Sequence, residues 1–476
     1  MRVFAPPTRP IAILPASEPV SSPCCPRGLA VAASSTFLSS APSAMWRATR
    51  RSPPFLRWLS SDAASSKAPR QRVAALWGNG DYGRLGLGSL ESRWSPTVCP
   101  FFLARAADPP ASLACGGAHT LFLTQNGRVF ATGLNDFGQL GIGTSVTHML
   151  EPVEISGFHE RVVEVSAGNH HSCAVTADGK LFVWGRNSGG QLGLGKGAGK
   201  VVSTPTKVDC LTDLRVKTVA LGSEHSIAVT EEGEVLSWGA AGSGRLGHGR
   251  QSSILGFSLT STEYTPRLIK NFDGIKIKKI AAGMLHSACI DEKGTLFIFG
   301  QKTEKGFGRP NEEFRPNIVE EIPFSEEVAC GGYHTCVVTD SGDLYSWGSN
   351  ENGCLGLGGT DMVRSPEILK SSLFKLPVSK VSCGWKHTAV VSAIRYRCAL
   401  STSKHPGDDI YTWGWGGANG TFFEEGHSSG GQLGHGNDVD YFEPMMVPFG
   451  TNARAVHVSC GFNHTGAIYE CSEDFD

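Results

Sequence analysis

The sequence of 476 residues lacks any apolar run approaching the ~18 residues that a helix needs to cross a bilayer. Its 14 cysteines include no Cys-x-x-Cys pair, so their spacing gives no support to a zinc site. The glycine-rich runs lack the Lys-Ser/Thr ending of a phosphate-binding loop, which argues against a nucleotide site. We therefore expect no membrane span, no catalytic residues, no metal and no cofactor.

Acidic side chains are scarce at the N-terminus. Residues 1–72 carry nine Arg and one Lys against only Glu18 and Asp62, a net charge of +8. The same segment holds 11 Pro and 13 Ser without a sustained apolar period, so it cannot bury enough surface to offset its ordering entropy. Composition that is rich in Arg and Ser and poor in acid is typical of an organelle transit peptide.

We predict a disordered mitochondrial transit peptide over residues 1–59, directing the protein to the matrix, and a linker over 60–72. Arg57 followed by Ser60 resembles a presequence cleavage site, which places the mature N-terminus near Ser60. Met45 is an alternative start, because a complete presequence follows it. A chloroplast peptide and an untargeted tail are the competing interpretations.

The remaining chain has 33 basic and 42 acidic side chains, a net charge of 33 − 42 = −9. A domain with a net negative charge has no overall attraction to phosphate groups, so non-specific nucleic-acid binding by the folded part is not expected.

From residue 73 onward, one unit of about 50 residues recurs seven times. Its first mark is Gly-x-x-His followed by Ser or Thr, with the histidines at His119, His171, His225, His286, His334, His387 and His464. Its second mark is Trp-Gly, at Trp77, Trp184, Trp238, Trp347 and Trp413, with Thr132-Gly133 and Phe299-Gly300 in the other two copies. A Gly-x-Leu-Gly run follows most of these pairs, and one proline then closes each loop. The repeats span about residues 73–126, 127–178, 179–231, 233–291, 293–340, 342–392 and 409–470, before a tail at 471–476.

Each repeat contains short alternating apolar runs joined by glycine turns such as Asn126-Gly127, which is the pattern of β-hairpins. Units of about four strands repeated seven times predict an all-β, seven-bladed β-propeller, since radial closure removes exposed sheet edges. A linear β-solenoid is the alternative, although its repeats are usually shorter.

The chain ends divide one hairpin between them. Val73–Trp77 has no His strand before it, and His464–Tyr469 has no Trp-Gly strand after it. We predict that these two segments pair antiparallel and close the ring.

Taken together, these marks resemble the repeat of the regulator of chromosome condensation (RCC1) family over about residues 73–470. The resemblance implies a seven-bladed propeller. In that family, nuclear members are exchange factors for the small GTPase Ran, plant UV-B receptors are homodimers that sense light through clustered tryptophans, and organellar members resemble assembly or RNA-processing factors. The photoreceptor depends on several Gly-Trp-Arg-His-Thr copies, which only Gly384–Thr388 resembles here, so we do not expect light sensing.

A residue required in every repeat is scaffold, whereas a catalytic residue is needed once. We therefore interpret the seven histidines and five tryptophans as structural, and most cysteines as small buried hydrophobic residues. Function is expected where the copies differ, either in long insertions or at isolated exceptional residues. The candidate partner contacts are Trp385, Lys386, Lys276, Lys278, Lys279, Phe422 and Phe423. For the three lysines of residues 276–279, an ordinary solvated strand face is the competing interpretation.

These observations lead us to expect a monomeric, non-enzymatic mitochondrial propeller that acts as a protein-interaction scaffold in organellar gene expression. Resemblance to plant mitochondrial members favours transcript splicing or processing for respiratory complex I. Because the body is acidic, any RNA contact should be indirect or confined to a local patch. Guanine-nucleotide exchange on a small GTPase is the alternative.

Overall fold

The computed structural model describes residues 71–249, 251–252, 258–259, 262–301, 314–374, 377–392, 408–417, 430–450 and 453–471. The predicted transit peptide, residues 60–70 of the predicted linker, and the candidate contacts Phe422 and Phe423 lie outside these residues. No helix in the described part is long and apolar enough to span a membrane.

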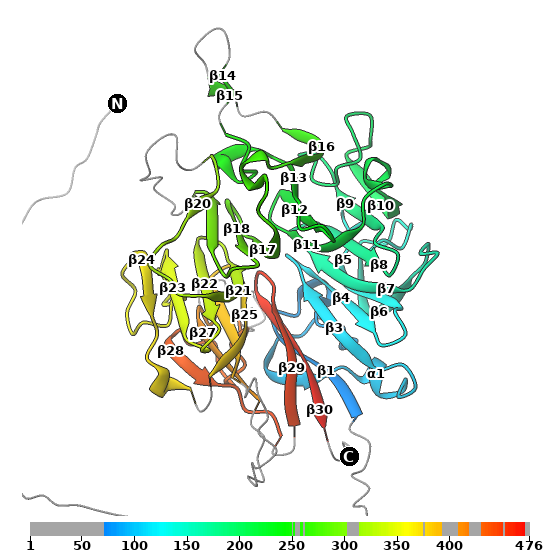
Figure 1. Cartoon of the computed structure of the whole chain (residues 1–476). Coiled ribbons are helices and arrows are strands. Elements are labelled where there is room, and N and C mark those ends of the chain that lie inside the picture. The colour runs from blue at the N-terminus through cyan, green and yellow to red at the C-terminus, as the bar shows by residue number, and fades with distance from the viewer. Residues whose placement is uncertain are drawn as a thin grey trace, which may run out of the picture. The chain divides into compact units, whose positions relative to one another are not determined.

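Within the described residues the strands form seven antiparallel four-stranded sheets and one small two-stranded sheet. The seven larger sheets follow one another around a ring (Figure 1), and each is one blade. The prediction of an all-β, seven-bladed propeller is confirmed. We number the blades I to VII in chain order from β3, so that blade VII combines the two ends of the described chain.

The four strands of a blade run from the axis outward. The innermost strands, in the order of blades I to VII, are β3 (Pro110–Cys115), β7 (Val162–Ala167), β11 (Val216–Leu221), β17 (Ile277–Ala282), β21 (Ser325–Cys330), β25 (Val378–Cys383) and β29 (Ala453–Cys460). The second strands all begin at a repeat histidine and are β4 (His119–Thr124), β8 (His171–Thr176), β12 (His225–Thr230), β18 (His286–Asp291), β22 (His334–Thr339), β26 (His387–Ser392) and β30 (His464–Cys471).

The third strands are β5 (Val129–Leu134), β9 (Leu181–Arg186), β13 (Val235–Gly239), β19 (Leu296–Gly300), β23 (Leu344–Gly348), β27 (Asp409–Gly414) and β1 (Gln71–Gly78). The outermost strands are β6 (His148–Ile155), β10 (Val201–Lys207), β16 (Glu263–Leu268), β20 (Asn317–Ile318), β24 (Val363–Ile368), β28 (Tyr441–Met446) and β2 (Arg93–Val98). Short elements join them: β14 (Gln251–Ser252), β15 (Ser258–Leu259), α1 (Pro100–Leu103) and 3-10 turns at Asp81–Gly83, Asp209–Leu211, Gly242–Gly244, Lys270–Phe272 and Ser371–Leu373.

Burial follows this order. Every residue of β4, β8, β12, β18, β22 and β26 is buried, because the second strand has a strand on each side and a blade on each face. The core is divided into clusters between adjacent blades. One of these clusters joins Trp184 of blade II to Leu121 and Leu140 of blade I. Each blade is therefore held by its neighbours rather than by one central core.

Blades and sequence repeats are out of phase. The sequence repeat 127–178 contains β5 and β6 of blade I followed by β7 and β8 of blade II. Each repeat thus supplies the outer half of one blade and the inner half of the next, which ties neighbouring blades together covalently.

The predicted closure of the ring is confirmed. In blade VII, β1 pairs antiparallel with β30 along its whole length, from Gln71 opposite Cys471 to Gly78 opposite His464. Arg72 of β1 adds an ion pair to Glu470 of β30, with 2.8 Å between Nη2 and Oε1. The two strands lie side by side in Figure 1.

The seven prolines noted in the sequence lie on the outer rim. Six are within an outermost strand and Pro316 directly precedes β20, the set being Pro96, Pro152, Pro205, Pro266, Pro316, Pro366 and Pro444. Proline has no N–H to offer, so these positions prevent a further strand from pairing with the exposed edge of a blade.

The ring has two unlike faces. The face that carries the Gly-x-x-His turns and the Gly-x-Leu-Gly loops is called the histidine face, and the opposite one, with the β-hairpin turns, the hairpin face. The insertions at residues 251–263 and 418–430 connect third to outermost strands, so they begin and end at the histidine face. Residues 302–309, where the fifth repeat lacks the Gly-x-Leu-Gly run, occupy the same kind of connection. The insertion at 393–409 replaces a hairpin turn, and β1 begins and β30 ends at the same hairpin face.

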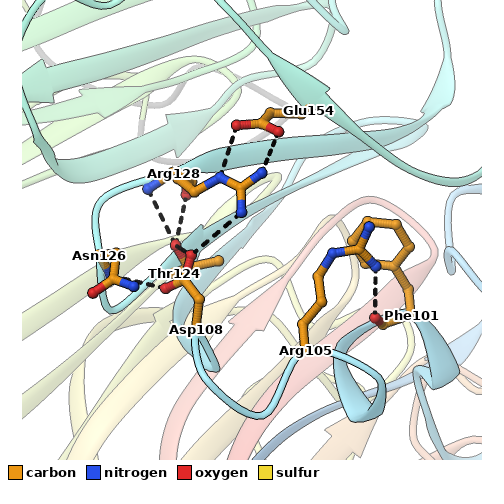
Figure 2. Close-up of polar contacts among 7 residues, drawn as sticks. All are labelled: Phe101, Arg105, Asp108, Thr124, Asn126, Arg128 and Glu154. Atoms are coloured by element: carbon orange, nitrogen blue, oxygen red, sulfur yellow. Dashed lines mark hydrogen bonds and ion pairs between the residues drawn. The ribbon is translucent and has the colours of Figure 1, made fainter.

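Polar side chains fix the turns of the hairpin face, as blade I shows (Figure 2). The Asp108 carboxylate accepts hydrogen bonds from Thr124 Oγ1 and from the backbone N–H of Asn126, both at 2.9 Å. Arg128 lies between this carboxylate and Glu154, to which it donates a bidentate pair of hydrogen bonds. The Arg128 and Glu154 side chains are nearly half exposed, so the pair orients the turn more than it stabilises the fold.

Candidate functional site

The seven repeat histidines form a closed circuit of hydrogen bonds around the ring. Each imidazole Nε2 lies beside the hydroxyl of the Ser or Thr that follows the histidine of the next blade. The pairs are His119–Ser172 at 2.9 Å, His171–Ser226 at 3.4 Å, His225–Ser287 at 2.9 Å, His286–Thr335, His334–Thr388 and His387–Thr465 at 3.0 Å, and His464–Thr120 at 2.9 Å.

The hydroxyls also fix where the imidazole proton sits. Six of them donate to the carbonyl of the variable residue in the neighbouring Gly-x-Leu-Gly loop, as Ser172 does to Gln139 at 2.8 Å and Thr388 to Cys354 at 2.8 Å. A hydroxyl has one hydrogen, so it can only accept from the histidine. In these six blades the imidazole therefore carries its proton on Nε2 and leaves a lone pair on Nδ1.

Burial keeps these imidazoles uncharged. It lowers the pKa of His119, His171, His334 and His387 to about 3, and that of His286 to about 4. The pKa values of His225 and His464 are also well below the ordinary range, again mainly because of burial. A neutral, buried histidine whose one proton is already bonded is poorly suited to acid–base catalysis near neutral pH.

The tryptophans join the same junctions. The Nε1 atoms of Trp184, Trp238 and Trp413 each donate at 2.9 Å to the loop carbonyl that the hydroxyl also uses, those of Gln139, Gln191 and Cys354. Both lone pairs of that carbonyl are thereby satisfied. Trp77 is equally buried, but no partner for its Nε1 is found in the described residues. Trp347, 4% exposed, lies in the interface between blades IV and V.

The glycine of Gly-x-x-His is required by the same geometry. A Cβ built on Gly222 would lie 2.3 Å from Cε1 of His225 and 2.5 Å from the carbonyl oxygen of Gly283 in the next blade. The imidazole therefore lies against the bare Cα. The Gly-x-x-His turn, the Trp-Gly pair and the Gly-x-Leu-Gly loop are thus parts of one inter-blade junction.

The chief departure from the repeat on the histidine face is an aromatic patch in blades VI and VII, formed by Trp385, Trp415, Phe462 and Lys386. The Trp385 ring centroid is 5.9 Å from that of Trp415 in an edge-on arrangement and 5.6 Å from that of Phe462. Lys386 Nζ lies 5.2 Å from the Trp385 centroid and 3.0 Å from the Glu351 carboxylate. The three aromatic side chains are half-buried.

This patch borders the axial hollow of the propeller. The hollow, of about 80 Å³, is lined by the turns of all seven blades, and Trp385 and Phe462 are among its lining residues. In the corresponding positions the other blades have Gly117, Asn169, Ser223, Met284 and Gly332. Comparison of the seven repeats singles out Trp385 and Lys386, but it gives no indication of Trp415. Trp415 directly follows the third strand of the same blade, β27, and lies against Trp385.

The three candidate lysines do not form a common basic surface. Lys278 lies 3.6 Å from Glu326 and over the Phe324 ring, whereas Lys279 bonds Glu327 at 2.8 Å. Lys276 precedes β17 and is exposed. Two of the three charges are thus compensated by carboxylates of the next blade.

A polar belt that the sequence analysis missed runs around the innermost strands. Each innermost strand contributes the residue that directly follows its β-bulge. These residues are Ser112, Glu164, Thr218, Lys279, Glu327, Lys380 and His457. Several members bond the next blade: Glu164 accepts from Thr218 at 2.8 Å, Lys380 donates to the Val456 carbonyl at 2.6 Å and His457 lies 2.8 Å from that of Leu113. Burial raises the pKa of Glu164 and lowers that of His457 to about 4.

The fold and the junctions define the class of this molecule, the seven-bladed propellers whose blades are joined through Gly-x-x-His turns. A profile of the RCC1-like domain matches residues 73–467. The chain therefore belongs to the family of RCC1-like domain proteins.

Relatives within the family differ in role. The chain is 32% identical to the ultraviolet-B receptor UVR8 of Arabidopsis thaliana over 387 residues, which is 79% of this chain and 77% of that protein. It is 30% identical over 302 residues to the RCC1 domain-containing protein RUG3, mitochondrial, of the same plant, covering 62% of this chain and 65% of RUG3. It matches the human E3 ubiquitin-protein ligase HERC2 at 32% over 364 residues, but this is only 7% of that ligase.

Solved structures agree on the fold. Human WBSCR16 superposes with a TM-score of 0.69 at 22% identity, covering 84% of this chain and 100% of that one. Prp20p from Saccharomyces cerevisiae gives a TM-score of 0.67 at 24% identity, covering 86% and 93%.

Proposed function

We propose that this protein is a non-enzymatic, mitochondrial RCC1-like propeller that serves as a protein-interaction scaffold in organellar gene expression, specifically in transcript splicing or processing for respiratory complex I. Support for the compartment comes from the Arg-rich, acid-poor leader and from similarity to RUG3, whose name places it in mitochondria. The gene-expression role follows the resemblance to organellar members of the family.

The observation that carries the scaffold proposal is the way the repeated polar groups are used. All seven imidazoles bond the next blade, and burial holds them neutral. The aromatic patch is therefore the candidate surface for a partner, and it lies on the histidine face, where the insertions at 251–263 and 418–430 also begin and end. Half-buried Trp and Phe rings with a neighbouring cation are the residue types enriched at protein interfaces. The acidic body favours protein partners over direct RNA binding.

Two experiments test the proposal. An import assay with isolated mitochondria should give a protected, shortened protein, and a reporter confined to cytosol or nucleus would refute the compartment. Affinity capture from mitochondria should then recover RNA-processing proteins with the unmodified chain and lose them with Trp385→Gly. Glycine is tolerated at this position, as Gly117 and Gly332 show. Met284→Ser, at the same position of another blade, is the matched control that should keep the partners.

Nucleotide exchange is the competing proposal. If a small GTPase is captured instead, and if the protein accelerates release of its bound guanine nucleotide, the scaffold proposal is replaced by exchange-factor activity.

A further inference from the structure

One inter-blade junction differs from the other six in its sulfur content. His334 and Cys336 lie two residues apart on β22 of blade V, so their side chains share one face of the strand. Cys383 ends β25 of blade VI and faces them. A ring nitrogen of His334 and the Sγ atoms of Cys336 and Cys383 all lie within 4.8 Å of one another.

This combination occurs once in the seven repeats. At the position of Cys336, two residues after the histidine, the other blades have Leu121, Cys173, Ile227, Ala288, Ala389 and Gly466. At the position of Cys383, before the glycine, the blade following each of these has respectively Ala167, Leu221, Ala282, Cys330, Cys460 and Cys115. Only blades V and VI supply a cysteine from both sides of one junction.

The hydrogen-bond circuit prepares this histidine as a ligand. Thr388 donates its hydroxyl hydrogen to the Cys354 carbonyl at 2.8 Å, so it accepts the Nε2–H of His334 at 3.0 Å. The Nδ1 atom is left with an unprotonated lone pair on a neutral imidazole. That is the form in which histidine binds metals, with its other nitrogen oriented by a hydrogen bond.

We propose that His334, Cys336 and Cys383 form a binding site for a zinc ion. Two cysteines and a histidine are a common partial donor set for Zn²⁺, which prefers S and N ligands in tetrahedral arrangement. On binding, each thiol releases its proton to solvent and forms a Zn–S bond, while the imidazole adds its lone pair. The sum of Zn²⁺ and two thiolates is neutral, which suits a buried position. Cu⁺ would leave one uncompensated negative charge there.

The fourth coordination position of the zinc ion can open into the axial hollow. Cys383 lines the axial hollow together with Gly331 and Gly332 of blade V, and the hollow has room for water, since one molecule needs ~10–15 Å³. A water molecule or a donor from a bound partner can complete the tetrahedron. The site therefore lies where the histidine face meets the axis, adjacent to the aromatic patch through Gly384 and Trp385.

The test uses the full chain, reduced with a phosphine and stripped of metal with a chelator. Added Zn²⁺ should be bound in competition with a chromogenic zinc indicator at one ion per chain. It should also raise the Tm and protect Cys336 and Cys383, identified by mass spectrometry, from alkylation. Cys336→Ala and Cys383→Ala should each weaken binding at least tenfold and abolish the protection.

These variants are expected to fold, because Ala389 and Ala167 occupy the same two positions in other blades. Cys173→Ala is the matched control: Cys173 also lies two residues after a repeat histidine, but it faces Leu221, so its removal should leave zinc binding unchanged. Failure to compete with the indicator would overturn the proposal. So would binding that is equally tight in the Cys336→Ala and Cys383→Ala proteins.

Discussion

At the scale of single residues, the junction explains why some repeat positions vary and others do not. The acceptor in the Gly-x-Leu-Gly loop is a backbone carbonyl, so the side chain at that position is free to differ. It is Arg84, Gln139, Gln191, Arg245, Cys354 or Gln432 in the blades whose loop is described. The hydroxyl that bonds this carbonyl has no such freedom, because it must donate to the loop and accept from histidine at once.

Replacing such a hydroxyl by a methyl group should therefore destabilise the ring without changing its shape. Thr465→Val leaves the Nε2–H of His387 and the carbonyl of Gln432 without this partner. We expect a loss of about 1–3 kcal/mol in the free energy of unfolding, measured by denaturant titration. Thr465→Ser keeps the hydroxyl, as Ser172 does in blade II, and should cost far less. Equal losses in the two variants would contradict this account of the junction.

The glycine facing the imidazole offers a second test. In Gly222→Ala the new methyl group would lie 2.3 Å from His225 and 2.5 Å from a backbone oxygen, so the junction must open. We expect destabilisation of about 1–3 kcal/mol or more, seen as a lower Tm. Gly359→Ala is the control, since a Cβ there meets nothing within 4 Å. It should change stability by no more than about 0.5 kcal/mol.

At the scale of strands, pairing across the chain ends determines whether the ring is closed. β30 is the second strand of blade VII and lies between β29 and β1. Without it, β1 and β29 would each present a row of unpaired backbone groups, and the clusters that join blade VII to blades VI and I would lose Ala467, Ile468 and Tyr469.

Removing residues 461–476 should therefore destabilise the whole molecule, although β30 is a single strand. We expect the Tm to fall well below that of the intact protein, or cooperative melting to be lost. Removing residues 472–476 alone leaves β30 complete and serves as the control. An unchanged Tm in the longer truncation would show that blade VII does not need the strand.

At the scale of the whole molecule, the histidine circuit couples stability to pH. The folded ring holds seven imidazoles with depressed pKa values, whereas in the unfolded chain their pKa would be ~6.5. Below this value the unfolded chain binds more protons than the folded one, so protonation favours unfolding. The stabilisation is complete above about pH 7 and declines as the pH falls toward the folded pKa values.

Each histidine should cost about 1.4 kcal/mol per pH unit below ~6.5, so the seven together remove about 10 kcal/mol by about pH 5.5. Because the free energy of unfolding of a typical domain is only about 5–15 kcal/mol, we expect cooperative unfolding near pH 5. Circular dichroism against pH would locate the transition, and its steepness should correspond to the uptake of several protons. A ring that stays folded at pH 4 would contradict the prediction.

The sequence was sufficient for the architecture because every blade repeats the same local signals, and Val73–Trp77 and His464–Tyr469 are visibly two halves of one hairpin. It was insufficient for contacts between side chains of different strands, whether within one blade or across to the next. Trp415 meets Trp385, and Cys383 meets Cys336, only because two strands from different parts of the chain are adjacent. A search for metal ligands spaced along the chain could not detect such a pair. The polar belt was missed because each repeat contributes one residue of different chemistry after a bulge.

The antiparallel junction of β1 and β30 also means that the start of the ring is arbitrary. Gln71 and Cys471 face each other as the two sides of a hairpin turn do in blade II, where Ala177-Asp178-Gly179 joins β8 to β9. A short glycine-containing linker between residues 471 and 71 would turn blade VII into an ordinary blade. The chain could then be opened at that turn in blade II instead. Such a circular permutant should reach the same native state, with its free ends displaced from blade VII to blade II.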